Sequence, residues 1–296
     1  MIGIKEKKFN KIINGQEKLI KKLEAQLHRM KSVSGRSGSS KSAVFVSDMH
    51  VGSSLALAPR HPYNSENDIE IKPNRVMTKL ADIWEYCIDH TSQKPHVLGM
   101  VGEPMDGDNF KQTGQQSWST SYIDQVNASS ELLKMWKVLN IIMVRGSGYH
   151  VQRGATNFEE LVARNIGAKR YRAYLPEDTK GVNEKDTASI TDYFADFRLG
   201  GKVFNMSHHI GYSKNEMYRT TGMARELVTM KLSTGLYNKA DIVVRGHVHY
   251  FTRVSFTHTS GFTCPAWKLP DAHLFRGGVG GTKPDIGVVE CIVEPN

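Results

Sequence analysis

Five short apolar runs, each followed at once by histidine or carboxylate side chains, are the strongest constraint on how this 296-residue chain folds. The runs and the polar residues after them are 43–46 before Asp48 and His50, 97–101 before Glu103 and Asp106, 141–144 before His150, 203–206 before His208 and His209, and 240–244 before His247 and His249. Short runs rich in β-branched residues indicate buried strands. Because open α/β sheets hold their sites at the carboxyl ends of strands, we expect these side chains to meet at one edge of a sheet.

Two of the clusters have the spacing of a chelating pair, Asp48 with His50 and His247 with His249. In extended backbone, side chains two positions apart point to the same face, so each pair is expected to converge on one point. A single pair of this kind arises often by chance and identifies nothing alone. Five such clusters after five predicted strands favour a shared metal site.

In order and placement, the clusters resemble the motifs of the calcineurin-like metallophosphoesterases over residues 43–293. Asp48 and His50 match the DxH motif, and Gly246, His247 and His249 match the GHxH motif. The family's isolated histidine after a strand is matched by His208, with His209 as the alternative.

The sequence departs from the family pattern at two positions. Glu103 stands where the GDxxD motif has an aspartate, and Tyr149 stands before His150, where the family has asparagine. A glutamate reaches one methylene further than an aspartate and can still bridge two cations. A phenol with a pKa near ~10 is a poor neutral oxygen ligand, so Ser147 or a backbone carbonyl of the 146–148 turn is the expected replacement for the asparagine.

The resemblance implies an α/β fold, a four-layer α/β/β/α sandwich of two mixed β-sheets flanked by helices. It implies two divalent metal ions, one held by Asp48, His50, Glu103 and His249 and the other by Glu103, His208, His247 and the replacement for the asparagine. Mixed imidazole and carboxylate ligands suit Mn²⁺, our first expectation, with Zn²⁺, Fe or Ni²⁺ as alternatives. By the same resemblance, a hydroxide activated by the metals attacks phosphorus, and His150 acts as general acid or stabilises the leaving oxygen.

The expected activity is hydrolysis of phosphodiester bonds, with DNA or RNA as substrate. A formal net charge of +9 favours a polyanionic partner. The tyrosine-containing stretch 146–150 and residues 284–287 also resemble phosphoesterases of bacteriophages. Two alternatives stay open: a catalytically impaired family member that binds nucleic acid or serves in assembly, and a phosphomonoesterase acting on a small molecule or nucleotide.

Several segments are expected to shape the substrate site. Arg60, in the loop after His50, and Tyr149 are the predicted substrate contacts. Residues 212–231 carry Lys214, Arg219 and Arg225 on a predicted helix, and the glycine-rich segment 274–281 is a predicted mobile lip.

The first 31 residues form a separate predicted unit, followed by a linker at 32–42 and the catalytic domain at 43–296. Apolar residues at heptad-like spacing on this lysine-dense segment predict a basic helix: Phe9, Ile13, Ile20, Leu23, Leu27 and Met30. We expect it to form a homo-oligomer through a short coiled coil. A basic arm on nucleic acid and a helix packed on its own domain are the alternatives.

The remaining periodicity predicts helices at 75–88, within 115–140 and at 158–165, and strands of a second sheet at 251–257, 261–267 and 287–293. Trp84, Trp136 and Trp267 are predicted core residues. Three cysteines without CxxC spacing and the lack of a secretory or membrane-spanning apolar run predict a cytoplasmic protein with no membrane partner.

Overall fold

A computed structural model describes residues 39–92, 94–109, 114–170, 189–213, 215–232, 240–271 and 283–295. The predicted N-terminal helix at 1–31, Lys214 and the glycine-rich segment 274–281 lie outside these residues. The first strand begins at Lys41, inside the segment predicted as a linker.

The first sheet is built from strands β1 (Lys41–Val46), β4 (Val97–Val101), β5 (Ile141–Val144) and β13 (Val289–Val293), in the order β13-β1-β4-β5. β1, β4 and β5 run parallel, and their carboxyl ends are level because Val46 pairs with Met100 and Val101 pairs with Val144. The predicted strands at 97–101 and 141–144 are confirmed. The assignment of the last strand to a second sheet was wrong, since β13 is the neighbour of β1.

The second sheet is mixed and has the order β11-β12-β10-β9-β8. Its strands are β8 (Phe194–Leu199), β9 (Lys202–Ser207), β10 (Ile242–Arg245), β11 (Thr252–Phe256) and β12 (Thr259–Thr263). β9, β10 and β12 are parallel, while β8 and β11 are antiparallel to their neighbours. The end of β9 is level with the end of β10, because Ser207 pairs with Arg245.

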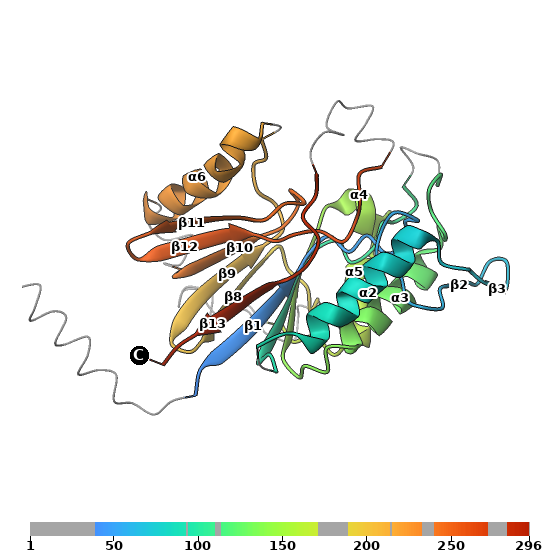
Figure 1. Cartoon of the computed structure of the whole chain (residues 1–296), viewed down its shortest axis with the longest axis horizontal. Helices are drawn as coiled ribbons and strands as arrows, with labels where there is room; N and C mark the ends of the chain where they lie inside the picture. The colour runs from blue at the N-terminus through green and yellow to red at the C-terminus, as the bar shows by residue number, and fades with distance from the viewer. Residues whose placement is uncertain are drawn as a thin grey trace, which may run out of the picture. The chain divides into compact units, whose positions relative to one another are not determined.

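The two sheets pack face to face through aromatic side chains. The ring of Phe45 on β1 lies 5.8 Å from that of Phe204 on β9 and 5.5 Å from that of Phe262 on β12, measured between centroids. Gly99 on β4 makes room for this contact, since a Cβ there would lie 2.6 Å from Phe45. The carboxyl ends of the parallel strands of both sheets lie on the same side, where His247 after β10 donates its N–H to Asp48 after β1 (Figure 1).

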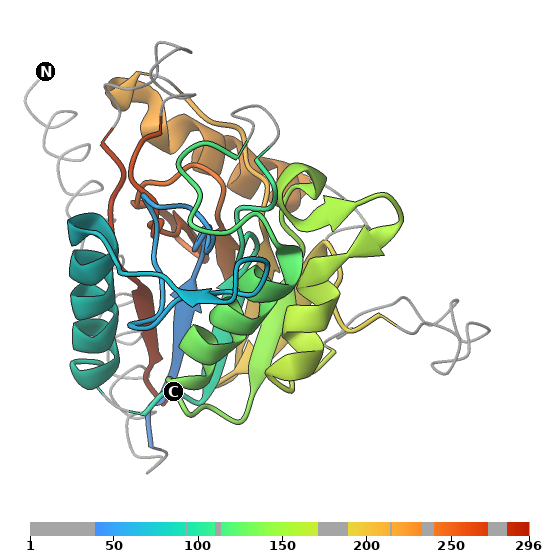
Figure 2. The ribbon, with the colours of Figure 1, turned by 90° about the vertical axis from the view of Figure 1, so that its right-hand side faces the viewer.

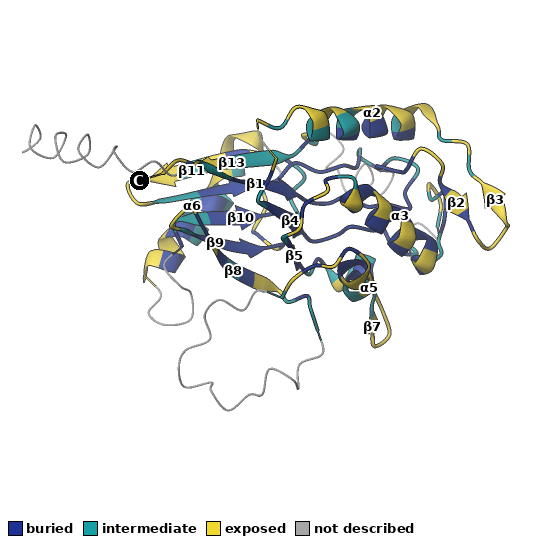
Figure 3. Cartoon of the chain, turned by 90° about the horizontal axis from the view of Figure 1, so that it is seen from below, coloured by how far each residue is buried: buried dark blue, intermediate teal, exposed yellow. Residues whose placement is uncertain are grey.

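Helices cover the outer face of each sheet. α2 (Arg75–Asp89), α3 (Tyr122–Lys134) and α5 (Phe158–Asn165) pack on the first sheet, and α6 (Arg219–Leu232) packs on the second. Figure 2 shows α3 and α5 side by side, with α2 on the other side of that layer. Figure 3 shows that β1, β4, β5, β9 and β10 are mostly buried, that β11 and β13 are less so, and that these helices keep an exposed outer face. The three predicted helices and the predicted α/β class are confirmed.

The core beneath the first helical layer is centred on tryptophan. Trp84 on α2 packs edge-on against Trp267 and Trp136, with centroid distances of 4.9 and 5.7 Å, and all three are buried as predicted. α2, α3 and α5 each begin at a polar side chain that accepts a backbone N–H, namely Asn74, Ser121 and Asn157.

Smaller elements complete the described part of the chain. They are α4 (Gly148–Val151), the 3₁₀ helix η5 (Glu216–Tyr218), and the hairpins of β2 (Tyr63–Asn64) with β3 (Ile69–Glu70) and of β6 (Gln152–Arg153) with β7 (Thr156–Asn157). Among the described residues, no helix combines the length and the apolar character needed to cross a bilayer. Cys87, Cys264 and Cys291 are free thiols.

Candidate metal centre

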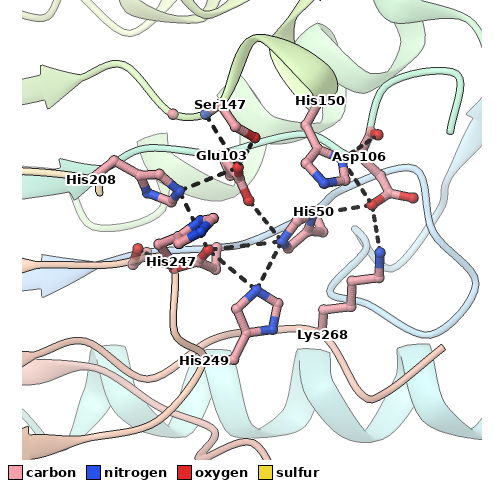
Figure 4. Close-up of polar contacts among 12 residues, drawn as sticks. His50, Glu103, Asp106, Ser147, His150, His208, His247, His249 and Lys268 are labelled. Atoms are coloured by element: carbon pink, nitrogen blue, oxygen red, sulfur yellow. Dashed lines mark hydrogen bonds and ion pairs between the residues drawn. The ribbon is translucent and has the colours of Figure 1, made fainter. Parts of the chain in front are cut away.

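The polar clusters after β1, β4, β5, β9 and β10 meet where the two sheets open together (Figure 4). Backbone contacts tie the loops to one another. His247 donates its N–H to Asp48 Oδ2 at 3.0 Å, which joins the two sheets. Gly246 donates to the carbonyl of His208 at 3.0 Å, and Asp48 donates to that of Gly102 at 3.1 Å. The expected meeting of the clusters at one edge is confirmed.

The candidate ligands converge through left-handed backbone, not through extended strands. Five of them have positive φ: Asp48 (51°), His50 (47°), Glu103 (56°), His247 (72°) and His249 (59°). The argument from strand alternation was therefore wrong in its geometry, because β1 and β10 end before the pairs begin. Non-glycine residues adopt this conformation at a cost and persist in it where the surroundings enforce it, which is common at functional sites.

A first group of four side chains offers ligand atoms that all lie within 4.8 Å of one another: Asp48, His50, Glu103 and His249. Nε2 of His50 lies 3.3 Å from Nε2 of His249 and 3.1 Å from Oε2 of Glu103. Nε2 of His249 lies 3.3 Å from Oδ1 of Asp48. These are the four residues predicted to hold the first metal ion, and the structure brings them together.

A second group faces the other oxygen of Glu103. Nε2 of His208 lies 3.2 Å from Glu103 Oε1. His208, His209 and His247 also offer ligand atoms within 4.8 Å of one another, so both candidates for the isolated histidine are at the site. The hydroxyl of Ser147 donates to Glu103 Oε1, so Ser147 lies beside this group, and its role as the replacement for the asparagine stays a prediction.

The hydroxyl of Tyr149 points to Asn109, which is not a candidate ligand. That hydroxyl donates to Asn109 Oδ1 at 3.1 Å, and the Asn109 amide donates to Asp106 Oδ2 at 3.0 Å. Tyr149 is thus joined to the cluster through two hydrogen bonds in series, as a neighbour of Asp106.

Two buried polar atoms at the centre lack hydrogen-bond geometry with any described residue: Asp48 Oδ1 and His208 Nε2. The ring orientations explain why the Nε2 atoms face inward. His208 donates from Nδ1 to the carbonyl of Val101 at 2.7 Å, and His50 donates from Nδ1 to Asp106 Oδ1 at 3.0 Å. Metal-binding histidines are commonly oriented by such a bond from their second nitrogen. The residues present therefore fit a divalent cation with nitrogen and oxygen ligands.

In the absence of cations, the imidazoles carry the charge that offsets the carboxylates. Burial alone would lower the pKa of His50, but hydrogen bonds to Asp106 and Glu103 raise it to about 9. Burial likewise opposes protonation of His208, whose pKa the charges of Glu103 and Asp48 raise to about 10. A cation that binds here has to displace these protons.

Asp48 and His247 shift in the opposite direction. Burial would raise the pKa of Asp48, but the neighbouring His208 and His249 lower it to about 2. Burial, followed by the charge of His208, lowers the pKa of His247 to about 4. At neutral pH the structure thus presents an ionised Asp48 and a neutral His247, which are the ligand forms of both side chains.

Asp106 bonds to Nδ1 of His50 and is itself paired with Lys268. Asp106 is fully buried, and its Oδ1 lies 3.0 Å from His50 Nδ1 and 2.7 Å from Lys268 Nζ. Despite burial, the Lys268 cation holds the pKa of Asp106 well below its ordinary value. Asp106 lay within a predicted motif but had no predicted role, and no local sequence signal pointed to Lys268.

Glu159, in the first turn of α5, ties two ligand loops together. Its carboxyl group accepts the N–H of Glu103 at 3.0 Å and the N–H of Gly146 at 2.9 and 3.0 Å. The side chain is completely buried, and burial raises its pKa to about 8. The sequence showed only an ordinary acidic residue at a helix start, so this contact was missed.

His150 lies on α4, beside the first ligand group. Its ring centroid is 4.6 Å from that of His50, and its Nδ1 donates to the carbonyl of Asp106 at 2.8 Å. Burial lowers the pKa of His150, although its side chain keeps 16% of its surface exposed. The predicted catalytic histidine is therefore oriented, close to the candidate ligands and partly exposed to solvent.

Arg60 is held by a helix. Its guanidinium lies 2.8 Å from Asp82 and 2.6 Å from Glu85, both on α2. Within the described part of the chain, none of its hydrogen bonds or ion pairs reaches the candidate ligands. A role for Arg60 in substrate binding stays a prediction.

Neither protein-family profiles nor curated protein sequences match this chain. Its structure is similar to several solved structures at low sequence identity. A predicted phosphoesterase from Streptococcus pneumoniae matches with 11% identity and a TM-score of 0.36 over 87% of this chain and 86% of that one. Vacuolar protein sorting 29 from Cryptosporidium parvum matches with 10% identity and a TM-score of 0.43 over 87% of each chain. An archaeal phosphodiesterase matches with 10% identity and a TM-score of 0.36, over 85% of this chain and 99% of that one.

The suggested likeness to bacteriophage members stays a prediction. In its fold, the chain is similar to solved phosphoesterases and to vacuolar protein sorting 29.

Proposed function

We propose that this protein is a metal-dependent phosphoesterase that hydrolyses phosphodiester bonds, with DNA or RNA as its substrate. The observation that carries the proposal is the position of Glu103 between two groups of ligand atoms. Its Oε2 faces His50 at 3.1 Å, and its Oε1 faces His208 at 3.2 Å. A carboxylate placed in this way is suited to bridge two cations, as hydrolytic sites with two metals require.

One cation would be held by Asp48, His50, Glu103 and His249. The other would be held by Glu103, His208, His247 and the Ser147 hydroxyl, with His209 as an additional imidazole. When bound, two divalent cations lower the pKa of a water molecule and neutralise charge on the phosphate oxygens. The mixed ligand set favours Mn²⁺, with Zn²⁺, Fe or Ni²⁺ as alternatives.

The charges of the ligand set favour an anionic substrate. With neutral imidazoles, Asp48 and Glu103 contribute two negative charges against four positive charges from two divalent cations. Asp106 and Asp271 share the Lys268 cation, at 2.7 and 3.1 Å from its Nζ, so these three groups add one net negative charge. The loaded site would therefore be positive, and it would attract a phosphodiester.

His150 is the side chain best placed to act on the leaving oxygen. Its Nδ1–H is used by the carbonyl of Asp106, so Nε2 is the atom available to hold or donate a proton. Asp106 fixes both His50 and His150, through its side chain and its carbonyl respectively. A general acid positioned in this way is worth roughly 10²–10⁴ in rate.

The net charge supports a polyanionic substrate. The chain has a formal net charge of +9, part of which lies in the lysine-dense N-terminal segment, and this charge alone does not distinguish nucleic acid from a small phosphoester. The two alternatives kept from the sequence, a phosphomonoesterase and an impaired member that binds nucleic acid or serves in assembly, are outcomes of the test below.

The test is elemental analysis of purified protein together with hydrolysis of bis-p-nitrophenyl phosphate. We expect two metal ions per chain and Mn²⁺-dependent hydrolysis, lost with chelator and in His249→Ala. His61→Ala is the matched control, because His61 is exposed and bonds to Glu70, outside the cluster. Hydrolysis of p-nitrophenyl phosphate alone would favour a phosphomonoesterase. Absence of both bound metal and turnover with any divalent cation would refute the proposal and favour the impaired member.

A further inference from the structure

A groove of about 650 Å³ runs along α6, beside the loop that follows β9. One wall is the segment Gly211, Tyr212 and Ser213, and the other includes Tyr218, Gly222 and Arg225. Gly222 brings the helix close to the loop, since a Cβ there would lie 2.2 Å from the carbonyl oxygen of Gly211. Figure 1 shows this loop rising from the end of β9 to the start of α6.

Residues that line the groove either lie close in sequence to candidate metal ligands or bond to a residue that does. Gly211 follows the cluster residue His209 by two positions. On the helical wall, the Glu226 carboxylate receives hydrogen bonds from Arg245 at 2.6 and 3.0 Å. Arg245 directly precedes Gly246 and His247. Both walls of the groove are thus continuous with loops that carry candidate ligands.

Two tyrosine rings stand exposed at this groove. Tyr212 is 60% exposed and Tyr218 is 57% exposed. Their hydroxyls make no hydrogen bond with a described residue, so nothing in that part of the chain fixes them as structural side chains. Exposed aromatic faces beside a positively charged path are the usual platform on which proteins stack the bases of single-stranded nucleic acid.

The charge of the groove complements a phosphate backbone. Glu226 is neutralised by the buried Arg245, and Glu216 lies 3.1 Å from Arg219. Arg225 lines the groove, is exposed, and has no ion-pair partner among the residues that the structure describes. Among the described residues that line the groove, Arg225 is therefore a cation without a compensating carboxylate.

Resting on the proposed function, we infer that this groove binds single-stranded nucleic acid, with Tyr212 and Tyr218 stacking on bases and Arg225 contacting a phosphate. The metal centre cuts the backbone, and the groove holds the strand that leads to it. Duplex nucleic acid fits this surface poorly, because its bases already stack on one another and are not available to the tyrosine rings.

The test is fluorescence anisotropy with a short fluorescein-labelled oligothymidylate, using the full chain in EDTA so that binding is read without cleavage. Tyr212→Ala and Tyr218→Ala are each expected to weaken binding by about 5- to 150-fold, since loss of stacking on one base costs roughly 1–3 kcal/mol. Tyr212→Phe and Tyr218→Phe should retain binding, because the ring is kept. Arg225→Ala should reduce the dependence of log Kd on log salt by about 0.7.

The matched control is Tyr86→Ala on α2, because Tyr86 is also 60% exposed and lies outside the groove. The basic N-terminal residues are the same in every variant, so a difference in Kd between variants comes from the substituted position. Equal weakening by all three tyrosine-to-alanine changes, or by none, would overturn the inference. So would duplex binding as tight as that of the single strand.

Failure of the inference and failure of the proposed function are distinguishable. Hydrolysis of bis-p-nitrophenyl phosphate by the wild-type protein reports on the metal centre and needs no groove. Oligonucleotide binding in EDTA reports on the groove and needs no metal. Turnover of the small ester without tyrosine-dependent binding would therefore refute only the groove, and the reverse result would refute only the hydrolase.

Discussion

Replacing Glu159 by alanine should strongly lower the free energy of unfolding of the protein. The substitution leaves the backbone N–H groups of Glu103 and Gly146 buried without the acceptor that now serves both. Each unsatisfied donor costs roughly 1–3 kcal/mol, so the expected loss is about 2–6 kcal/mol. That is a large fraction of the ~5–15 kcal/mol by which a typical domain is stable.

Glu159→Gln separates the acceptor from the charge. Oε1 of Glu159 accepts both N–H groups, and Oε2 also accepts that of Gly146, so a glutamine keeps the shared acceptor and loses only the second contact to Gly146. Burial raises the pKa of Glu159 to about 8, so the side chain is largely neutral near pH 7 and the amide is close to its isostere. We expect Glu159→Gln to lose less than about 1.5 kcal/mol. Glu131→Ala, exposed on α3, is the matched control and should stay within about 0.5 kcal/mol.

The assay is urea unfolding in chelator, followed by tryptophan fluorescence and far-UV circular dichroism, with the midpoint compared at constant slope. Mn²⁺ affinity should also fall about 10–100-fold in Glu159→Ala, because the loops that carry Glu103 and Ser147 lose their shared anchor. If Glu159→Ala unfolded at the same urea concentration as Glu131→Ala, the carboxyl group would not be serving the two backbone donors, and the reasoning would fail.

Three further predictions concern the ligand loops. By elemental analysis, Glu103→Gln should bind fewer than two metal ions, because it removes the negative charge shared by both ligand groups, whereas Glu103→Asp should bind two. The wild-type number of metal ions in Glu103→Gln would contradict bridging. The affinity for Mn²⁺ should rise with pH, and Mn²⁺ binding should release protons, because the pKa values of His50 and His208 are raised to about 9 and about 10. Calorimetry in buffers of different ionisation enthalpy measures both effects, and an affinity independent of pH would count against this prediction. Gly246→Ala should lower thermal stability by about 1–3 kcal/mol, since its Cβ would lie 2.1 Å from Ser47 Oγ, and an unchanged Tm would show that the loops can separate freely.

The sequence predicted the strands that carry the site because their signal is local. Val97–Val101 and Ile141–Val144 are continuous apolar runs that end at glycine or arginine, and the structure has strands with these bounds. β8 escaped prediction because its burial alternates around an exposed Phe194 and a half-buried Asp196, which leaves no continuous run. The partner of β13 was misassigned because strand pairing is set by the whole topology and not by the strand's own residues.

Ligand identity was easier to predict than ligand support. Asp48, His50, Glu103 and His249 each follow a strand, so their position in the sequence already indicates where they lie. Lys268 comes from an irregular segment after β12, and only the fold brings its amine to Asp106. A residue whose role is to orient another residue carries no spacing signal, because its partner is distant in the chain.

Glycine and left-handed backbone together explain how so many ligands fit into so little space. A Cβ on Gly102 would lie 2.6 Å from His208 Nδ1, and one on Gly146 would lie 2.5 Å from Glu103 Cγ. These close approaches require glycine between the loops, while the ligand side chains themselves turn inward by adopting positive φ. The cost of the strained backbone falls on the residues proposed to bind metal. In chelator these loops should therefore be the first part of the described core to exchange amide hydrogens, and bound cations should slow that exchange.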